Sequence, residues 1–359
     1  MASELTTKLR VGDHVTTQFS FILSTTTFAS SIFAGVALAA SPLNSSPQAD
    51  DPIHTPAELV ESMHSAFGYN HCRAVHAKGI ILEGEFTPDI HAKDLTKAQH
   101  LQGPRSNVTV RFSDFSGAPT IPDNDLLANP RGMAIRFELP GGASTDLIAH
   151  SFNGFPVSNT DDLRELLLDF AASRPGAATP TILDRFLELH PTAKTFLAEQ
   201  KTPASFATIS YYGIGSFKFT NAKGESHYVR YQLRPEAGEE LLTDQERESQ
   251  SANYIMDEIK SRVATAPIAF GLYAQVAERG DKIDDPSIAW PDNRKRVLLG
   301  RLQITKVIAN TVEEDRSLVF IPSNVPAGIE AADVMSSFYS KVFRLSAKDA
   351  REVASISGK

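Results

Sequence analysis

The chain contains one cysteine, Cys72, among its 359 residues. A single cysteine excludes an intrachain disulfide, a thiolate zinc cluster and an iron–sulfur site held by cysteines. The chain also lacks basic character, because its formal net charge is −8. Nucleic-acid-binding proteins usually carry a basic surface, so we predict that nucleic acid is not a partner.

Signatures of several common enzyme classes are missing as well. The patterns HExxH, Gly-x-Ser-x-Gly and Gly-x-Gly-x-x-Gly do not occur, and there is no Walker loop. Hydrolase, NTPase and dinucleotide-dependent activities therefore have no motif support. Hydrophobic residues make up 42% of the chain and charged residues 22%, which is typical of a globular protein with a buried core.

The N-terminal 54 residues differ in composition from the rest. An uncharged run at 19–40 ends in small residues that resemble a signal-peptidase site, although acidic residues precede it. A cleaved signal or membrane anchor would make the protein secreted or membrane-associated. An organelle presequence or a disordered arm, which would place it in an organelle or the cytoplasm, stays open. We predict a targeting, anchor or disordered segment with a linker at 1–54, and a folded core at 55–359.

Local patterns in the core predict strands interrupted by helices. A capping box at Thr55 and Glu58 precedes an amphipathic helix over about 56–68. A second capping box leads into a helix predicted over 244–263, and the tail from Ile329 onward is helical in pattern. Runs typical of strands, one of them a hairpin, occur at 108–112, 133–137, 217–233, 268–277 and 297–307. This order disfavours a parallel doubly wound sheet.

Four separated segments carry a more specific signal. They are RAVHAKG at 73–79, VRFS at 110–113, NPRGMA at 129–134 and FNGFPV at 152–157. At these segments, in this order, the chain resembles the catalase family. It is most similar to the short catalase-related peroxidases, or haem minicatalases, which lack the long wrapping and C-terminal domains of full catalases. The resemblance implies an α+β fold, with an antiparallel eight-stranded β-barrel of the catalase type and surrounding helices.

The resemblance also implies catalytic roles. His76 matches the distal histidine, which takes a proton from one peroxide oxygen and gives it to the other. Asn153 matches the distal asparagine, whose amide positions peroxide by hydrogen bonding. Ser113 matches the serine that bonds to the histidine ring and fixes its orientation.

Further residues match positions that hold the cofactor, which the resemblance implies to be haem b with its iron. Arg73 and Arg111 match arginines that pair with the haem propionates. Val75 matches a small apolar residue that narrows the channel above the iron. All three would therefore contact the haem or its substrate channel.

The chain departs from the family at the expected iron ligand. The family ligates iron through a tyrosine in an Arg-x-x-x-Tyr pattern, and here Phe343 stands at the tyrosine position and Tyr339 at the arginine position. Tyr339 precedes Phe343 by about one helical turn, or about 6 Å. Three outcomes are open: Tyr339 ligates iron after a local shift, the iron has no protein ligand or an unusual one, or haem binding is impaired. We take Tyr339 as the predicted axial ligand.

The predicted function is that of a haem peroxidase. It would reduce hydrogen peroxide or small organic peroxides with electrons from a small organic donor, and weak catalase activity stays open. Ser158 and Leu166 stand where the family has channel aromatics, which predicts a wider pocket. One alternative is a catalase-like haem enzyme that oxidises or rearranges a dedicated small molecule in a biosynthetic pathway. The other is a haem-free barrel that binds an apolar ligand. Assembly into a homo-oligomer is also open.

Overall fold

The computed structural model describes residues 52–309 and 311–357. The predicted segment at 1–54 lies outside this range except for its last three residues, so its targeting interpretations stay predictions. Within the described part of the chain, no helix combines the length and the apolar character needed to cross a membrane.

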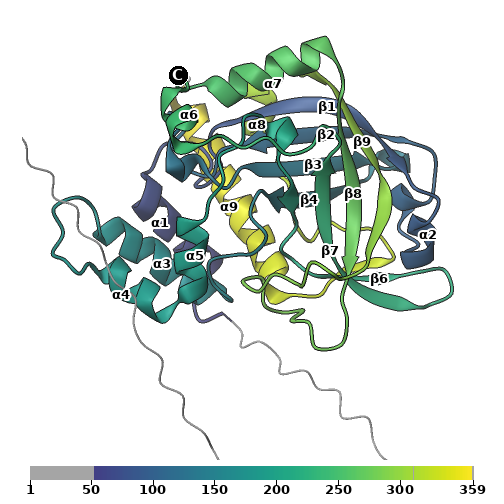
Figure 1. The fold of residues 1–359 in the computed structure, drawn as a ribbon, viewed down its shortest axis with the longest axis horizontal. Helices are drawn as coiled ribbons and strands as arrows, with labels where there is room; N and C mark the ends of the chain where they lie inside the picture. Colours follow the sequence, from purple (N-terminus) through teal and green to yellow (C-terminus); the bar gives the residue numbers. More distant parts are fainter. Residues whose placement is uncertain (1–51, 310, 358–359) are drawn as a thin grey trace, which may run out of the picture. The chain divides into compact units, whose positions relative to one another are not determined.

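Antiparallel strands close into a barrel of eight (Figure 1). Around the barrel the order is β7-β5-β4-β3-β2-β1-β9-β8, and β8 closes it by pairing with β7. Two short strands, β6 and β10, extend the sheet beyond β7. The bounds are β1 Gly79–Pro88, β2 Ser106–Ser113, β3 Gly132–Glu138, β4 Ser144–His150, β5 Tyr211–Tyr212, β6 Phe217–Thr220, β7 Ser226–Pro235, β8 Ile268–Val276, β9 Arg296–Val307 and β10 Ile329–Ala331. The predicted eight-stranded antiparallel barrel is confirmed.

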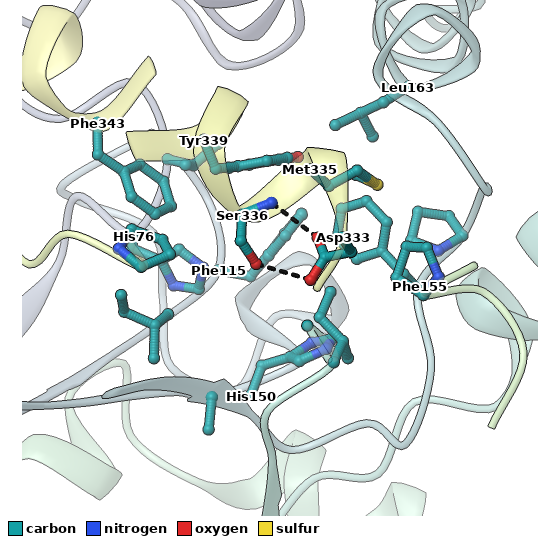
Figure 2. Close-up of a pocket in the computed structure, with 18 of the residues that line it drawn as sticks. His76, Phe115, His150, Phe155, Leu163, Asp333, Met335, Ser336, Tyr339 and Phe343 are labelled. Atoms are coloured by element: carbon teal, nitrogen blue, oxygen red, sulfur yellow. Dashed lines mark hydrogen bonds between the residues drawn. The ribbon is translucent and has the colours of Figure 1, made fainter. Parts of the chain in front are cut away.

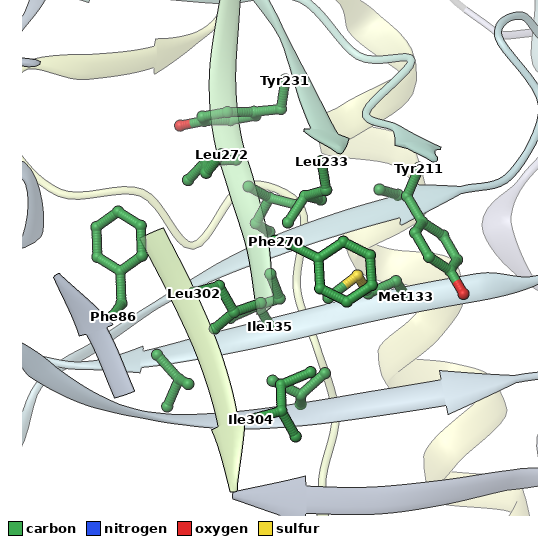
Figure 3. Close-up of a cluster of buried hydrophobic side chains, with 14 of the residues drawn as sticks. Phe86, Met133, Ile135, Tyr211, Tyr231, Leu233, Phe270, Leu272, Leu302 and Ile304 are labelled. Atoms are coloured by element: carbon green, nitrogen blue, oxygen red, sulfur yellow. The ribbon is translucent and has the colours of Figure 1, made fainter. Parts of the chain in front are cut away.

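The inside of the barrel is filled with apolar side chains. Figure 3 shows Phe86, Ile135, Leu233 and Phe270 among them, and each is fully buried. They belong to one continuous hydrophobic cluster contributed by every strand of the barrel. A barrel of eight strands has an interior just wide enough for side chains to fill. A ligand site therefore has to lie outside the barrel wall.

Helices surround the barrel, and α1, α3, α4 and α5 gather on one side of it (Figure 1). Their bounds are α1 Pro56–Phe67, α2 Ala92–Leu95, α3 Thr160–Ala172, α4 Ile182–Leu189, α5 Pro191–Ala198, α6 Asp244–Ser249, α7 Tyr254–Thr265, α8 Thr311–Ser317 and α9 Val334–Ser357. A second hydrophobic cluster joins α1, α3, α4 and α9 through residues that include Leu59, Met63, Leu163 and Phe338. Figure 1 shows α9 between these helices and the barrel, so α9 contributes a wall to any space there.

The structure corrects two of the predicted elements. The helix predicted over 244–263 is two helices, α6 and α7, because the Asp123 carboxylate accepts hydrogen bonds from the backbone N–H groups of Ile255 and Met256. Those donors are free only where a helix begins, so α7 needs its own start. The tail predicted as helical from Ile329 begins with β10, which pairs with β6, and its helix begins at Val334. The helix at 56–67 and the hairpin of β6 and β7 are confirmed.

Candidate active site

A cavity of about 150 Å³ lies between the barrel and α9. Its lining is mostly apolar and aromatic, and Figure 2 shows His76, Phe115, His150, Phe155, Tyr339 and Phe343 around it. A second cavity of about 70 Å³ shares His76, Val75 and Phe343 with the first. The second cavity is also lined by Arg73, Arg111 and Ser113, so the two together lead from an apolar space to a basic one.

His76 is fixed by backbone contacts on both sides of its residue. Its φ of 55° lies in the left-handed region, which few residues other than glycine adopt. The backbone N–H of His76 donates to the Phe115 carbonyl at 2.8 Å, and the His76 carbonyl accepts from Arg111 Nη2 at 2.8 Å. These bonds hold the unusual conformation, which is the kind of constraint that clusters at active sites.

The ring of His76 is oriented by two oxygens. Its Nδ1 lies 3.0 Å from the Asp114 backbone carbonyl oxygen and 3.1 Å from Ser113 Oγ. A carbonyl oxygen can only accept, so Nδ1 must carry the ring hydrogen. Nε2 is then the unprotonated nitrogen, and His76 lines both cavities. Burial lowers the pKa of His76 to about 3, with the Arg111 charge acting in the same direction, so the ring is a neutral base at physiological pH.

Gly132 makes room for this arrangement. It pairs with Ser113 across β2 and β3, and with His150 across β3 and β4. A Cβ atom at position 132 would lie 2.5 Å from Ser113 Oγ and 2.8 Å from His76 Nδ1, closer than side chains can approach. A glycine is therefore required here for the ring to sit against the sheet.

The two predicted propionate arginines converge on one carboxylate. Arg111 Nη2 lies 3.0 Å from Asp315 Oδ2, and Arg73 Nη2 lies 3.2 Å from Asp315 Oδ1. Arg73 also donates to the Leu318 carbonyl at 2.6 Å, at the end of α8. Burial alone would raise the pKa of Asp315, but the arginines bring it below its usual value. This pair of guanidinium groups thus binds a carboxylate, although the carboxylate belongs to the chain itself.

The α9 wall of the cavity is aromatic. Figure 2 shows the Phe343 ring over His76, while the hydroxyl of Tyr339 points toward Met335. The Tyr339 ring packs edge-on against Phe343 at 5.4 Å and against Phe155 at 6.2 Å between ring centroids. Burial raises the pKa of Tyr339, so its phenol is neutral in this environment. The family position opposite the histidine is therefore filled by a ring that cannot ligate iron.

The structure brings most of the predicted residues together, with one exception. His76, Ser113, Val75, Arg73, Arg111 and Tyr339 all line one or both cavities. Asn153 is half-buried in the loop between β4 and α3 and is not among the lining residues. Ser158 and Leu166 do not line these two cavities either, whereas Leu163 and Leu167 line the larger one. The wider pocket predicted from Ser158 and Leu166 thus has no support from those two positions.

Four polar groups of the site were not predicted. His150, at the end of β4, lines the larger cavity with Asp333 and Ser336, and Asp315 pairs with the two arginines. The sequence held a weak signal for His150, since it lies directly after an apolar strand pattern and close to the FNGFPV segment. Asp315 lies in a short acidic stretch that does not distinguish it from its neighbours.

Comparison with known proteins places the chain in a family. The catalase family model matches residues 70–337, which is more than half of the chain. A catalase-related peroxidase of Mycolicibacterium paratuberculosis is 34% identical over 78% of this chain and 89% of its own length. A catalase-related peroxidase of Synechococcus elongatus is 31% identical over 81% of this chain and 87% of its own length. The chain therefore belongs to the catalase family, whose members are haem oxidoreductases that act on peroxide.

Solved structures agree on the fold. A bacterial catalase superimposes with a TM-score of 0.66 at 19% identity, covering 77% of this chain and 57% of the catalase. A fungal catalase gives a TM-score of 0.66 at 20% identity, covering 76% of this chain and 57% of its own. The chain thus spans little more than half the length of these full catalases, and it resembles in extent the short relatives.

Family membership implies a haem cofactor in general, and the residues that line the two cavities fit a haem on some sides and not on others. On the barrel side they fit, because His76 presents a neutral imidazole with an open Nε2. At the edge they also fit, since Arg73 and Arg111 already hold a carboxylate, the group that haem carries at its own edge. On the α9 side, Phe343 offers no donor atom, and Tyr339 is a lining residue with an oxygen able to ligate iron.

Proposed function

We propose that the protein is a haem b-dependent peroxidase that reduces hydrogen peroxide or small organic peroxides. The electrons would come from a small organic donor. The observation that carries this proposal is His76, whose Nδ1 is tied to Asp114 and Ser113 while Nε2 is unprotonated and the ring faces the cavities. A neutral imidazole held in this way can take a proton from one oxygen of a bound peroxide and deliver it to the other.

Residues at the edge and on α9 would hold the cofactor. When bound, haem supplies the redox-active iron of the reaction. Arg73 and Arg111 would bind its propionates in place of Asp315, and Val75 would lie beside it. Tyr339 is our proposed axial ligand, because it lines the same cavity as His76 and a tyrosine oxygen can ligate haem iron.

The test compares the full chain with its His76→Ala variant after haem reconstitution. We expect the variant to keep the Soret band, because His76 does not ligate iron in this proposal. Its kcat/KM for hydrogen peroxide with an organic donor should fall about 10²- to 10⁴-fold, the usual contribution of a general acid–base. His91→Ala, at an exposed position that lines neither cavity, is the control and should keep wild-type turnover. Wild-type turnover in His76→Ala with an intact Soret band would contradict the proposal.

A second candidate function follows from the lining of the larger cavity. Phe115, Phe155, Leu163 and Leu167 make it strongly apolar, which suits a small organic molecule as the dedicated substrate. Product analysis of candidate apolar compounds with peroxide and reconstituted enzyme would distinguish this from general peroxide reduction. A purified protein that shows no Soret band after reconstitution would instead support a haem-free ligand-binding barrel.

A further inference from the structure

We propose that His150, rather than Asn153, supplies the second polar group that meets peroxide, and that His76 and His150 together favour hydrogen peroxide over organic peroxides. The proposal rests on the proposed function, because it concerns the substrate of the same site. It starts from the observation that two imidazoles line the cavity, and that Nε2 of one of them, His150, is buried with no hydrogen-bond partner among the described residues.

The sheet register places the two rings over the same stretch of backbone. Ser113, Gly132 and His150 are directly opposite one another on β2, β3 and β4, so they share one face of the sheet. Neighbouring positions in such a row lie about 4.5–5.5 Å apart. The His76 ring lies against Gly132, in the middle of the row. Because Gly132 has no side chain, nothing from β3 separates His150 from His76.

One ring nitrogen of His150 lacks a hydrogen-bond partner in the described part of the chain. The exposed fraction of His150 is 9%, and this nitrogen, Nε2, is buried. The rings around it are apolar, since Phe155 and Phe196 lie at 6.3 and 6.2 Å between centroids. A buried polar atom left unpaired costs about 1–3 kcal/mol, so a ligand or water that bonds to it gains that much. Figure 2 shows the ring directed into the cavity.

The protonation of His150 matches that of His76. Burial lowers the pKa of His150 to about 4, although the Gly154 backbone opposes this effect. The ring is therefore neutral at physiological pH, and one of its two nitrogens carries no hydrogen. We assign the hydrogen to Nδ1, because Nε2 has no hydrogen-bond partner among the described residues. Both histidines therefore present an Nε2 that accepts and cannot donate.

Asp333 and Ser336 also line the cavity, but the Asp333 oxygens already accept hydrogen bonds from Ser216 and Ser336. Two imidazole acceptors in this mostly apolar cavity select for a small molecule with two O–H groups. Hydrogen peroxide has one hydrogen on each oxygen, so it can satisfy both nitrogens at once. An alkyl hydroperoxide has only one such hydrogen and would leave one imidazole unpaired. An asparagine amide at this position would have offered donors as well as an acceptor. In this proposal the imidazoles of His76 and His150 both accept hydrogen bonds from the bound peroxide.

The experiment measures kcat/KM for hydrogen peroxide and for tert-butyl hydroperoxide in the haem-reconstituted full chain. We expect His150→Ala to lower the value for hydrogen peroxide about tenfold or more, because one of two hydrogen bonds is lost. The value for tert-butyl hydroperoxide should change by less than about threefold, so the ratio of the two falls. His150→Asn keeps a hydrogen-bonding side chain and should recover part of the ratio.

Controls separate this role from a structural one. His100→Ala removes an equally buried histidine that packs on Phe137 inside the barrel, and it should leave the ratio unchanged. Cyanide affinity, followed by the Soret shift, needs one proton acceptor and should weaken in His76→Ala but stay within about threefold in His150→Ala. That binding measurement also reports whether the cavity of the variant is intact.

Three results would overturn the inference. The first is an unchanged ratio in His150→Ala. The second is a fall of the ratio in Asn153→Ala with none in His150→Ala, which would return the role to the asparagine. The third is a wild-type protein that binds haem but turns over neither peroxide, or binds no haem, which would reject the proposed function and this inference with it. The first two results leave the proposed function standing, so the two failures are distinguishable.

Discussion

The barrel wall and the α9 wall of the cavity are built in different ways. On the barrel wall, His76 is held by hydrogen bonds to Phe115, Asp114, Ser113 and Arg111. Arg111 and Ser113 lie in the paired strand β2, and Asp114 and Phe115 follow that strand directly. The α9 wall is one helix, which lines the cavity with Met335, Ser336, Tyr339 and Phe343. The proton chemistry of the site is therefore fixed by many contacts, whereas iron ligation depends on a single position along a helix.

Substitutions at Tyr339 and Phe343 are expected to have the largest effect, because they test directly whether iron ligation depends on one position of α9. If Tyr339 ligates iron, Tyr339→Phe should shift the Soret band and weaken haem affinity at least about tenfold, since even indirect supports of a metal site cost that much. Phe343→Tyr puts a phenol over His76 and should strengthen haem binding. Haem titration followed by absorbance measures both. An identical spectrum and affinity in Tyr339→Phe would exclude Tyr339 as the ligand.

Adding one carbon to the barrel wall tests how rigid it is. In Gly132→Ala, the new methyl group would meet Ser113 Oγ and His76 Nδ1 at less than 3 Å, so the ring has to move. We expect a loss of about 1–3 kcal/mol in the free energy of unfolding, and peroxide turnover reduced about tenfold. Gly103→Ala is the control, because a Cβ there meets only one atom, at 3.9 Å. Equal denaturation curves for Gly132→Ala and Gly103→Ala would show that the barrel wall accommodates the added methyl group without losing stability.

The smallest effect concerns stability in acid. Burial lowers the pKa of His76 to about 3 and those of His100 and His150 to about 4, against about 6.5 in an unfolded chain. Between these values the unfolded chain binds more protons, so the free energy of unfolding falls as pH drops below about 6.5. Asp114 opposes this trend, because burial raises its pKa to about 7 and its protonation favours the folded chain.

Replacing one of these histidines should therefore make the free energy of unfolding less dependent on pH. His150→Asn lowers by one the difference in bound protons between the unfolded and the folded chain. This change reduces the slope of the free energy of unfolding by at most about 1.4 kcal/mol per pH unit. Urea denaturation of both proteins between pH 5 and 7.5 measures the two slopes. Parallel slopes would mean that His150 titrates normally in the folded chain, contrary to its burial.

The sequence was sufficient for the barrel and for the residues whose partners lie in the same short segments. Strand patterns and ordered motifs predicted β2, β3, the hairpin of β6 and β7, and the contact between His76 and Ser113. His150 was missed because its position beside Gly132 depends on the register of three strands, which the weak local signal does not reveal. Asp315 was missed because it meets Arg73 and Arg111 from more than 200 positions away along the chain. Helix α7 was merged with α6 because its start is set by a distant carboxylate.

The carboxylate of Asp315 gives the polypeptide its own counterion. Two guanidinium groups buried near each other would repel, and that repulsion would weigh against folding. With Asp315 between them, one of the two positive charges is balanced from within the chain. The barrel and its helices can consequently assemble with this repulsion reduced, and an incoming acidic molecule has to compete with an internal anion for the same two side chains.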